Sequence, residues 1–231
     1  DIAEEAEHAG WSRDICSYAR TDIGAMLSGK TPVGRLPRPD MLVCCTNICQ
    51  TVLHWYRVLA DYFGCPLVLI DTPFLYEEAH DHEIAYVRRQ IEDMIHVAEE
   101  IAGKPLDEKR FEDVMQNARR GAELWLEVLN RSQHRPAPMT AFDGFIHMGP
   151  IVDMRGEAAA VEYYERMLLE LDARIKQGVG AIKDERYRVL WDNLPIWFKI
   201  GEFSKWLGEQ GVNVVASTYT YAWGELAPMI D

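Results

Sequence analysis

The sequence predicts an α/β protein, built from Rossmann-like parallel-sheet units with a helical insert between them. Two observations lead to this class. Short apolar runs at residues 40–47 and 66–71 flank an amphipathic segment, which is the pattern of a strand–helix–strand unit. The same alternation returns at 187–217, after a long stretch in which apolar residues repeat at helical spacing. Continuous apolar runs are typical of parallel strands, because such strands are buried on both faces of their sheet.

The first α/β unit is expected to cover residues 1–77. It opens with "DIAEEAEHAGWSRD", which has a helical pattern, and a proline-rich linker leads into the first strand. The helix between the strands is predicted by one apolar face, made of Val52, Trp55, Tyr56, Leu59 and Phe63. Gly64 should end this helix, and Thr72-Pro73 should end the second strand. We therefore expect the two strands to pair in parallel through a right-handed crossover.

The helical insert is expected at residues 78–180, where apolar residues recur at helical spacing in three successive segments. After it, "YRVLWDN" predicts a strand, "WFKIGEFSKWLGEQG" a helix closed by Gly211, and "VNVVAST" another strand. The chain begins without Met and stops just after this strand. We therefore expect residues 181–231 to be the start of a second α/β unit that is truncated.

Composition and charge exclude several kinds of partner. The formal net charge is −13 and no basic tract compensates it, which disfavours nucleic acid and an anionic membrane surface. No run of about 18 apolar residues is present, so no transmembrane helix is expected. The five cysteines are not spread along the chain as they are in a protein held by several disulfide bridges. This favours a reducing cytoplasm with free or metal-bound thiols.

The cysteines themselves differ in their predicted environment. Cys44 and Cys45 lie in a predicted strand, where successive side chains face opposite ways, so both cannot bind one metal. Cys49 follows the carboxyl end of that strand, near the first turn of the next helix, where α/β sheets bind ligands. The helix N-terminus there also favours negative charge. Cys16 is the only cysteine outside the cluster, and no CxxC run supports an iron–sulfur site by spacing alone. From the residues alone, packing and cluster ligation both stay open.

Three segments carry a resemblance: "DICSYARTDIGAML", "PDMLVCCTNICQTVLHWYRVLADYFGCPLVLIDTP" and "YRVLWDNLPIWF". In this order and at these intervals they resemble subunits of the 2-hydroxyacyl-CoA dehydratase and benzoyl-CoA reductase superfamily. The resemblance implies a [4Fe–4S] cluster held by Cys16 and Cys49, with Thr46 and Asn47 as further contacts or as residues that shape the turn. No cysteine follows Cys65, so we expect a further ligand beyond the end of this chain; the alternative is that this subunit does not hold a cluster.

The resemblance also implies a reaction and partners. A separate ATP-dependent iron–sulfur activator would supply one electron, and the resulting ketyl radical of a 2-hydroxyacyl-CoA would lose water. One alternative is a subunit of an ATP-dependent benzoyl-CoA reductase, which reduces an aromatic ring. Another alternative is a non-catalytic electron-relay or structural subunit. All three imply a homologous sister subunit, in a heterodimer or a higher assembly. The first two imply an acyl-CoA substrate on this subunit, whereas in the third the sister subunit holds the substrate. We expect a cytoplasmic location, as the cysteines indicate.

Two further residues are candidates for the acyl pocket or for proton transfer. Asp192 follows the first strand of the second unit, and we expect it to face the acyl group of the substrate. His147, in "FIHMGPIVDMRG", could transfer a proton, although a single histidine is equally typical of ordinary packing. A polyanionic CoA also needs basic residues, and Lys30, Arg35 and Arg38 beside the proline-rich linker are candidates, with solvated surface as the alternative.

Overall fold

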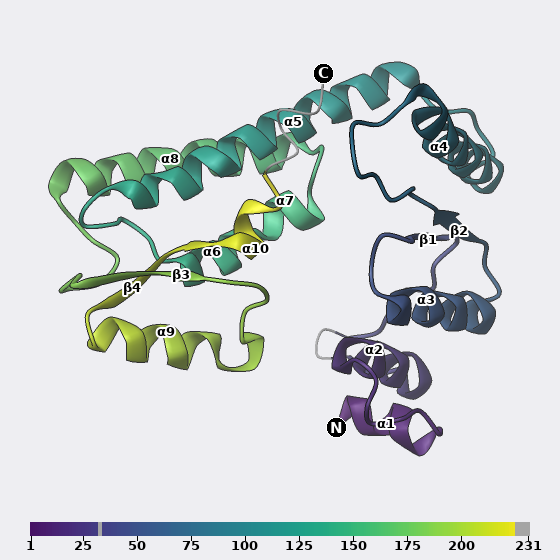
Figure 1. Ribbon diagram of the computed structural model, residues 1–231, viewed down its shortest axis with the longest axis horizontal. Coiled ribbons are helices and arrows are strands. Elements are labelled where there is room, and N and C mark those ends of the chain that lie inside the picture. Colours follow the sequence, from purple (N-terminus) through teal and green to yellow (C-terminus); the bar gives the residue numbers. More distant parts are fainter. Residues whose placement is uncertain (32–33, 225–231) are drawn as a thin grey trace. The chain divides into compact units, whose positions relative to one another are not determined.

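The computed structural model describes residues 1–31 and 34–224 of the chain (Figure 1). Its helices are α1 (Ile2–His8), α2 (Ser17–Ser28), α3 (Gln50–Phe63), α4 (Asp81–Ala102), α5 (Glu108–Asn130), α6 (Ala141–His147), α7 (Gly149–Asp153), α8 (Ala158–Gln177), α9 (Ile200–Glu209) and α10 (Thr218–Tyr221). Its strands are β1 (Leu42–Cys45), β2 (Leu67–Ile70), β3 (Tyr187–Trp191) and β4 (Val212–Ser217). Short 3₁₀ helices cover Arg131–Gln133 and Trp197–Lys199. The protein is thus mixed α/β, mostly helical, with small two-stranded parallel sheets.

The chain divides into two compact units between Leu106 and Asp107. Within residues 78–180, where the helical insert is predicted, the elements are all helices, α4 to α8 and one 3₁₀ turn. These helices are shared between the units: α4 packs against β2, whereas α5 packs against α8. The expected three-part division at residues 77 and 180 stays a prediction, and residues 225–231 of its last part lie outside the described residues.

The first sheet is the predicted parallel pair. β1 and β2 are in register from Leu42 beside Leu67 to Cys45 beside Ile70, and α3 is the crossover between them. The helix ends where the sequence predicts, because Gly64 takes the left-handed conformation with φ of 63°. A glycine adopts this conformation without the steric cost that other residues incur.

The core of the first unit joins its first three helices. Its buried side chains are Ala6, Ile23, Met26 and Leu59. The helices α1 and α2 approach so closely that a Cβ at Gly24 would lie 1.9 Å from the carbonyl oxygen of Ile2. Only glycine fits at this crossing, so the packing of α1 depends on that residue.

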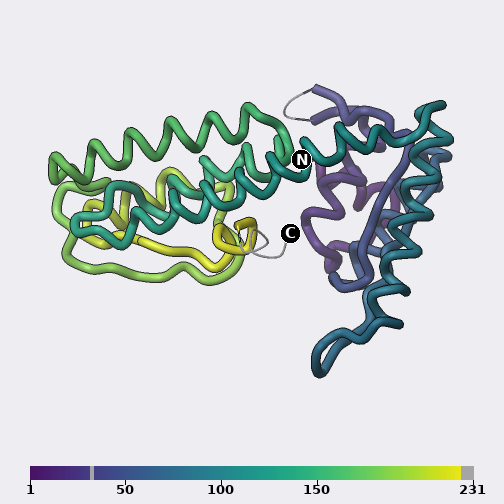
Figure 2. Tube along the Cα trace, turned by 90° about the horizontal axis from the view of Figure 1, so that it is seen from above, coloured from purple at the N-terminus to yellow at the C-terminus, as the bar shows by residue number. Residues whose placement is uncertain are grey.

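The second unit contains the larger core. The helices α5 and α8 run side by side over it in both views (Figures 1 and 2). Trp125 of α5 is fully buried, and its indole N–H donates to the carbonyl of Thr220 at 2.9 Å. This bond joins α5 to α10, which are far apart in the sequence.

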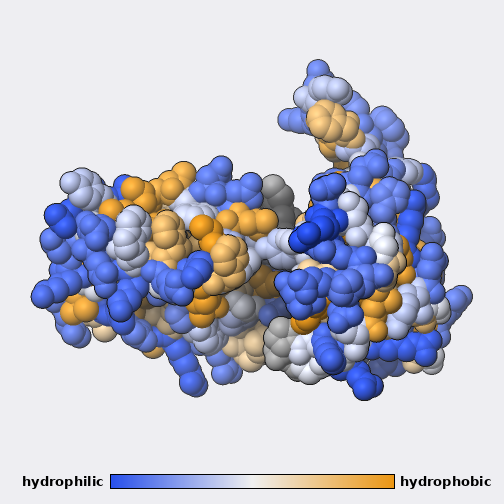
Figure 3. All heavy atoms as spheres, turned by 90° about the horizontal axis from the view of Figure 1, so that it is seen from below, coloured by the Kyte–Doolittle hydropathy of each residue, from blue (hydrophilic) through white to orange (hydrophobic). Residues whose placement is uncertain are grey.

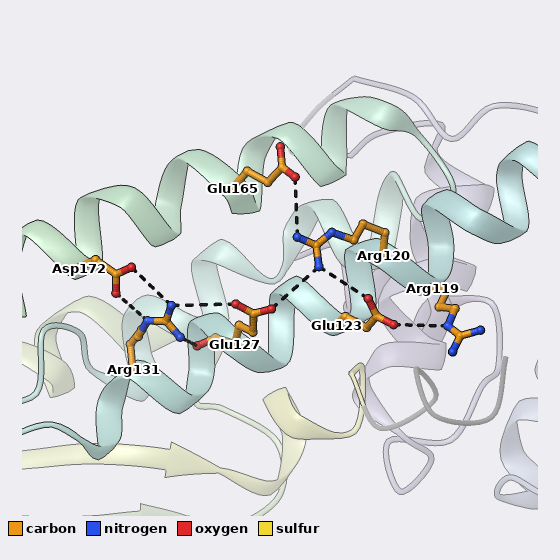
Figure 4. A network of polar contacts seen from close by, with 7 residues as sticks. All are labelled: Arg119, Arg120, Glu123, Glu127, Arg131, Glu165 and Asp172. Atoms are coloured by element: carbon orange, nitrogen blue, oxygen red, sulfur yellow. Dashed lines mark hydrogen bonds and ion pairs between the residues drawn. The ribbon is translucent and has the colours of Figure 1, made fainter. Parts of the chain in front are cut away.

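Ion pairs line the exposed side of α5 and α8 (Figure 4). Arg131 binds Asp172 through two nitrogens, at 2.7 and 3.4 Å, and Arg120 reaches Glu165 at 3.8 Å. These side chains are partly exposed, so water and salt screen them and they contribute little to stability singly. The pairs Arg131–Asp172 and Arg120–Glu165 connect the segment of α5 and its C-cap to α8.

The second sheet is also the predicted strand–helix–strand unit. β3 and β4 pair in parallel, with a register shift between Val189 and Leu190, and α9 connects them. Exposed apolar side chains lie on this strand–helix–strand segment, namely Leu190, Leu194, Phe198 and Trp206. Seen from below, apolar atoms gather between polar groups on the surface of the second unit (Figure 3). Among residues 1–31 and 34–224, no helix is long and apolar enough to cross a membrane.

Candidate functional site

The two candidate cluster ligands occupy the same structural position. Cys16 is the N-cap residue of α2, and Cys49 is the N-cap residue of α3. Both side chains are exposed. The first backbone N–H groups of a helix have no partner within that helix, and together with the helix dipole they favour negative charge at its N-terminus. Each thiol therefore lies at the end of a helix that favours a bound anionic group.

The two helices that begin at these thiols belong to one packed body. The indole N–H of Trp55, in α3, donates to the carboxylate of Asp22, in α2, at 2.8 Å. Burial raises the pKa of Asp22, and the bond from Trp55 opposes this rise. The side chains of Ile23 and Leu59 also meet in the same core. The orientation of α2 relative to α3 is therefore determined by both polar and apolar contacts.

Of the two strand cysteines, only Cys44 is a packing residue. Cys44 is buried and Cys45 is exposed, which confirms the predicted alternation. Burial raises the pKa of Cys44, and the neighbouring thiols of Cys45 and Cys49 raise it further. A buried neutral thiol is a small apolar side chain. Cys65 is half-buried.

The donor set fits an iron–sulfur cluster in kind but not in number. Such a cluster is held by about four ligands, usually thiolates. Cys16 and Cys49 suit it because both are exposed thiols at helix N-termini. Within the described part of the chain, no three His, Cys, Asp or Glu side chains are grouped so that they could hold a metal ion. The remaining ligands would have to come from elsewhere.

Thr46 joins the carboxyl ends of the two strands. Its hydroxyl donates to the carboxylate of Asp71 and accepts the backbone N–H of Thr72 at 3.2 Å. The Thr46 hydroxyl is the main cause of a lowered pKa at Asp71, followed by the Tyr86 hydroxyl at 2.7 Å. Asn47 is exposed in the turn between Thr46 and Cys49. This network fixes the start of the turn that carries Cys49, whereas contact of Thr46 or Asn47 with a cluster stays a prediction.

Sequence reasoning missed two residues of this network. Tyr86 and Gln90 lie four positions apart on α4, so they share a face of that helix. Gln90 accepts the backbone N–H of Asp71 at 2.7 Å and donates to its carbonyl at 2.9 Å. The spacing was visible in the sequence, but nothing local showed that this face meets the end of β2.

Asp192 is held in the same way at the second sheet. Thr218, which follows β4, donates its hydroxyl to Asp192 at 2.8 Å and accepts the backbone N–H of Asn193 at 3.0 Å. Asn193 has a φ of 70°, which is uncommon for a residue other than glycine. Asp192 is exposed at the carboxyl end of β3, as predicted. Its contact with an acyl group stays a prediction.

His147 is the last residue of α6. Its Nδ1 lies 2.6 Å from the hydroxyl of Tyr163, on α8. His147 lines a cavity of about 600 Å³ within the second unit. Of the expected CoA-binding residues, Lys30, Arg35 and Arg38 are exposed, and Arg38 donates to the carbonyl of Phe63 at 3.0 Å.

Comparison with known proteins agrees with the sequence motifs. Residues 1–229 match the family model described as "2-hydroxyglutaryl-CoA dehydratase, D-component". The chain is 36% identical over 226 residues to the "(R)-2-hydroxyisocaproyl-CoA dehydratase alpha subunit" of Clostridioides difficile, covering 96% of this chain and 55% of the relative. It is 33% identical over 233 residues to the "(R)-phenyllactyl-CoA dehydratase alpha subunit" of Clostridium sporogenes, covering 100% of this chain and 57% of the relative. It is also 34% identical over 232 residues to a benzoyl-CoA reductase subunit of Thauera aromatica, covering 95% of this chain and 54% of the relative. The chain thus spans about half the length of each relative.

Proposed function

The chain belongs to the 2-hydroxyglutaryl-CoA dehydratase D-component family, and from this premise we propose that it is part of the iron–sulfur subunit of a 2-hydroxyacyl-CoA dehydratase. The observation that carries the proposal is the family match over residues 1–229. Relatives named as dehydratase alpha subunits support the same assignment. The reaction would be the radical elimination of water from a 2-hydroxyacyl-CoA.

The chain's own residues would contribute part of a cluster site. A bound [4Fe–4S] cluster would supply the single low-potential electron that the elimination needs. Cys16 and Cys49 would provide two of its ligands from the N-termini of α2 and α3. For both thiols to bind one cubane, their sulfurs should lie roughly 6–7 Å apart, because iron–sulfur bonds are about 2.3 Å long. The bond between Thr46 and Asp71 would keep the turn before Cys49 in place.

Other residues would act on the substrate or on partners. Asp192 would face the acyl group, and His147 is a candidate for proton transfer. The partners would be a homologous sister subunit and an ATP-dependent iron–sulfur activator. The exposed apolar side chains of the second unit, such as Phe198 and Trp206, offer surface for such a subunit contact.

Reduction of an aromatic ring is the second candidate function. Its support is the 34% identity to a benzoyl-CoA reductase subunit, close to the 36% identity to a dehydratase subunit. Assays of the complete enzyme with activator and ATP would separate the two, using a 2-hydroxyacyl-CoA in one arm and benzoyl-CoA in the other. Turnover of benzoyl-CoA alone would replace the dehydratase assignment. Iron binding without turnover of either thioester would favour a relay subunit.

Metal content tests the ligand assignment directly. The full-length protein, purified without oxygen, should contain about four irons and about four labile sulfides per chain. Cys16→Ser and Cys49→Ser should each remove most of this iron, because each loses a ligand. Cys44→Ser and Cys65→Ser are the matched controls and should keep it. Full iron content in the Cys49→Ser protein would contradict the assignment.

A further inference from the structure

One hydrogen bond joins the two helices that begin at the candidate cluster ligands. The indole N–H of Trp55 donates to the carboxylate of Asp22 at 2.8 Å. Asp22 is the sixth residue after Cys16. Trp55 is likewise the sixth residue after Cys49. Because an α-helix rises about 1.5 Å per residue, the bond lies about 9 Å along each helix from its thiol. The two thiols are thus equally far along their helices from the same contact.

A second bond gives the relative direction of these helices. The hydroxyl of Tyr62, in α3, donates to the backbone carbonyl of Met26, in α2, at 3.5 Å. Compared with Trp55 and Asp22, both partners lie further towards the C-terminus of their helix. In an antiparallel pair, later residues of one helix would meet earlier residues of the other. The N-termini that carry the two thiols therefore lie towards the same end of the helix pair.

Neither thiol takes part in the cap of its own helix. Cys16 and Cys49 are N-cap residues, but neither side chain accepts a hydrogen bond from a backbone N–H of the first turn. No local bond of this kind therefore fixes either thiol. The distance between the two thiols depends on how α2 is placed against α3.

Asp22 is an unfavourable residue for a contact that serves packing alone. Its side chain is partly buried, and burial raises its pKa while the bond from Trp55 lowers it, with no contribution from a cation. A buried carboxylate without a cation is unfavourable unless hydrogen bonds satisfy it. Ile23 and Leu59 already supply apolar contact between the same helices. What the bond from Trp55 adds is direction, because a hydrogen bond tolerates little change in distance or angle.

We propose that Asp22 and Trp55 are positioning residues that keep the two thiols at the spacing that one cluster requires. This role rests on the proposed function, because it takes both thiols as ligands of a single cluster. A shift or rotation of α2 against α3 would break the bond and move one thiol away from the other. The two residues act through the helices that they join, and neither is assigned a contact with the cluster or the substrate.

Iron release tests this role in the loaded protein. The full-length protein, purified without oxygen, is mixed with an iron chelator, and the loss of cluster absorbance is followed over time. Asp22→Ala and Trp55→Phe should each release iron about tenfold faster than wild type, because small displacements of positioned groups have large effects. Asp22→Asn should stay close to wild type, because its amide oxygen can still accept the indole N–H. The double variant should be no faster than the single variants, since both changes remove one bond.

A reagent that bridges two thiols tests the spacing without a cluster. After the cluster is removed from the full-length protein, dibromobimane alkylates two neighbouring thiols, each of which displaces one bromide and loses one proton. Mass spectrometry of the peptides identifies the bridged pair. Wild type and Asp22→Asn should form the bridge between Cys16 and Cys49. Asp22→Ala and Trp55→Phe should form it about tenfold more slowly. Asp61→Ala, an exposed change in α3, is the matched control and should behave as wild type.

A further control separates positioning from a general loss of stability. Val68→Ala, in β2, removes apolar side-chain atoms from the same unit and should lower its stability. It should still release iron and form the bridge at wild-type rates. Iron release from Val68→Ala as fast as from Asp22→Ala, at equal stability in urea, would overturn the positioning role.

The remaining outcomes distinguish this role from the proposed function. Wild-type rates of iron release and bridging in both Asp22→Ala and Trp55→Phe would overturn the positioning role and leave the ligand assignment intact. The same holds if Asp22→Asn is as fast as Asp22→Ala, because the bond would then not be what matters. Wild-type protein that forms no bridge between Cys16 and Cys49 would instead contradict the ligand assignment itself.

Discussion

At the scale of single residues, Thr46 shows how one hydroxyl can join two strands. Thr46 follows β1. Its hydroxyl donates to the carboxylate of Asp71 and accepts the backbone N–H of Thr72, and both of these residues follow β2. The sequence allowed two roles for this threonine, turn formation and contact with a cluster. The observed bonds support the first role, whereas contact of Thr46 with a cluster stays a prediction.

The first prediction concerns the charge of Asp71. Thr46→Val removes the hydroxyl that contributes most to the lowered pKa of Asp71, so that pKa should rise towards its ordinary value. Carboxyl ¹³C NMR across an acid titration measures it. Thr21→Val, an exposed change in α2, is the control and should leave the Asp71 titration unchanged. Identical titrations in the wild type and Thr46→Val would mean that the hydroxyl does not bond to Asp71.

Glu185 provides a second prediction at this scale. Burial raises its pKa, but hydrogen bonds from Arg188, Asn213 and the N–H of Ala137 outweigh burial, and the pKa is lowered overall. These bonds are 2.6, 2.7 and 3.1 Å long. A lowered pKa in the folded state means stability that is present above the ordinary pKa of Glu, about 4.3, and is lost as the pH falls through the folded value.

Glu185→Gln should therefore destabilise the second unit by about 1–3 kcal/mol at neutral pH, because it replaces an anion that accepts three hydrogen bonds. The difference from wild type should shrink as the pH falls through the lowered folded-state pKa of Glu185, where the wild-type carboxylate takes up a proton. Urea unfolding at neutral and at acid pH measures both values. Glu162→Gln, an exposed change in α8, should show neither effect. A destabilisation that is the same at both pH values would contradict the charge argument.

At the scale of elements, the two strand pairs end in the same arrangement. After the first pair, a threonine hydroxyl donates to Asp71 and accepts the next backbone N–H, that of Thr72. After the second pair, Thr218 does the same to Asp192 and to the N–H of Asn193. The order is exchanged, because the threonine follows the first strand in one case and the second strand in the other. Both bridges connect carboxyl ends of parallel strands, the edge at which such sheets bind ligands.

Gly24 gives the prediction at this scale. A methyl group there would meet the Ile2 carbonyl oxygen at 1.9 Å, so Gly24→Ala must push α1 away from α2. We expect a loss of about 1–3 kcal/mol and faster hydrogen exchange in α1 and α2. Gly201→Ala in α9 is the matched control, because nothing lies within 4 Å of a Cβ there. That variant should keep or slightly raise stability. Unchanged exchange in α1 after Gly24→Ala would show that the close crossing does not form.

At the scale of the whole molecule, residues 1–31 and 34–224 form two hydrophobic cores. One is built from side chains of α1 to α3, with Ile23 and Leu59 at its centre. The other joins α5, α6 and α8 to β4 through residues such as Trp125, Phe142 and Val214. The buried residues of each core lie on one side of the boundary between Leu106 and Asp107.

The two cores should therefore respond separately to mutation. Leu124→Ala leaves a cavity in the second core and should cost about 2–5 kcal/mol there. Hydrogen exchange should become faster in α5 and α8 while β1 and β2 keep their protection. Leu169→Ala, at a side chain that is 73% exposed, is the control and should change neither. An equal loss of protection in both units would show that they unfold as one.

The sequence by itself determined the local elements and the family. Apolar runs and helical spacing predicted β1, α3 and β2, and Gly64 predicted the end of α3, because these signals act between residues that are close along the chain. Strand alternation likewise predicted that Cys44 and Cys45 would face opposite ways, and one is buried and the other exposed. The motifs around Cys16 and Cys49 indicated the family that the comparison confirms.

Only the tertiary structure decided which distant side chains meet. It brought three sets of residues into hydrogen-bond contact: Tyr86 and Gln90 with Asp71, Tyr163 with His147, and Thr218 with Asp192. It also assigned α4 to the first unit and α5 to the second. Such contacts depend on the angle and rotation at which whole elements pack, and many positions of a helix can present a polar group at suitable spacing. The packing of the cores selects among them, and that selection is a property of the folded chain rather than of any local pattern.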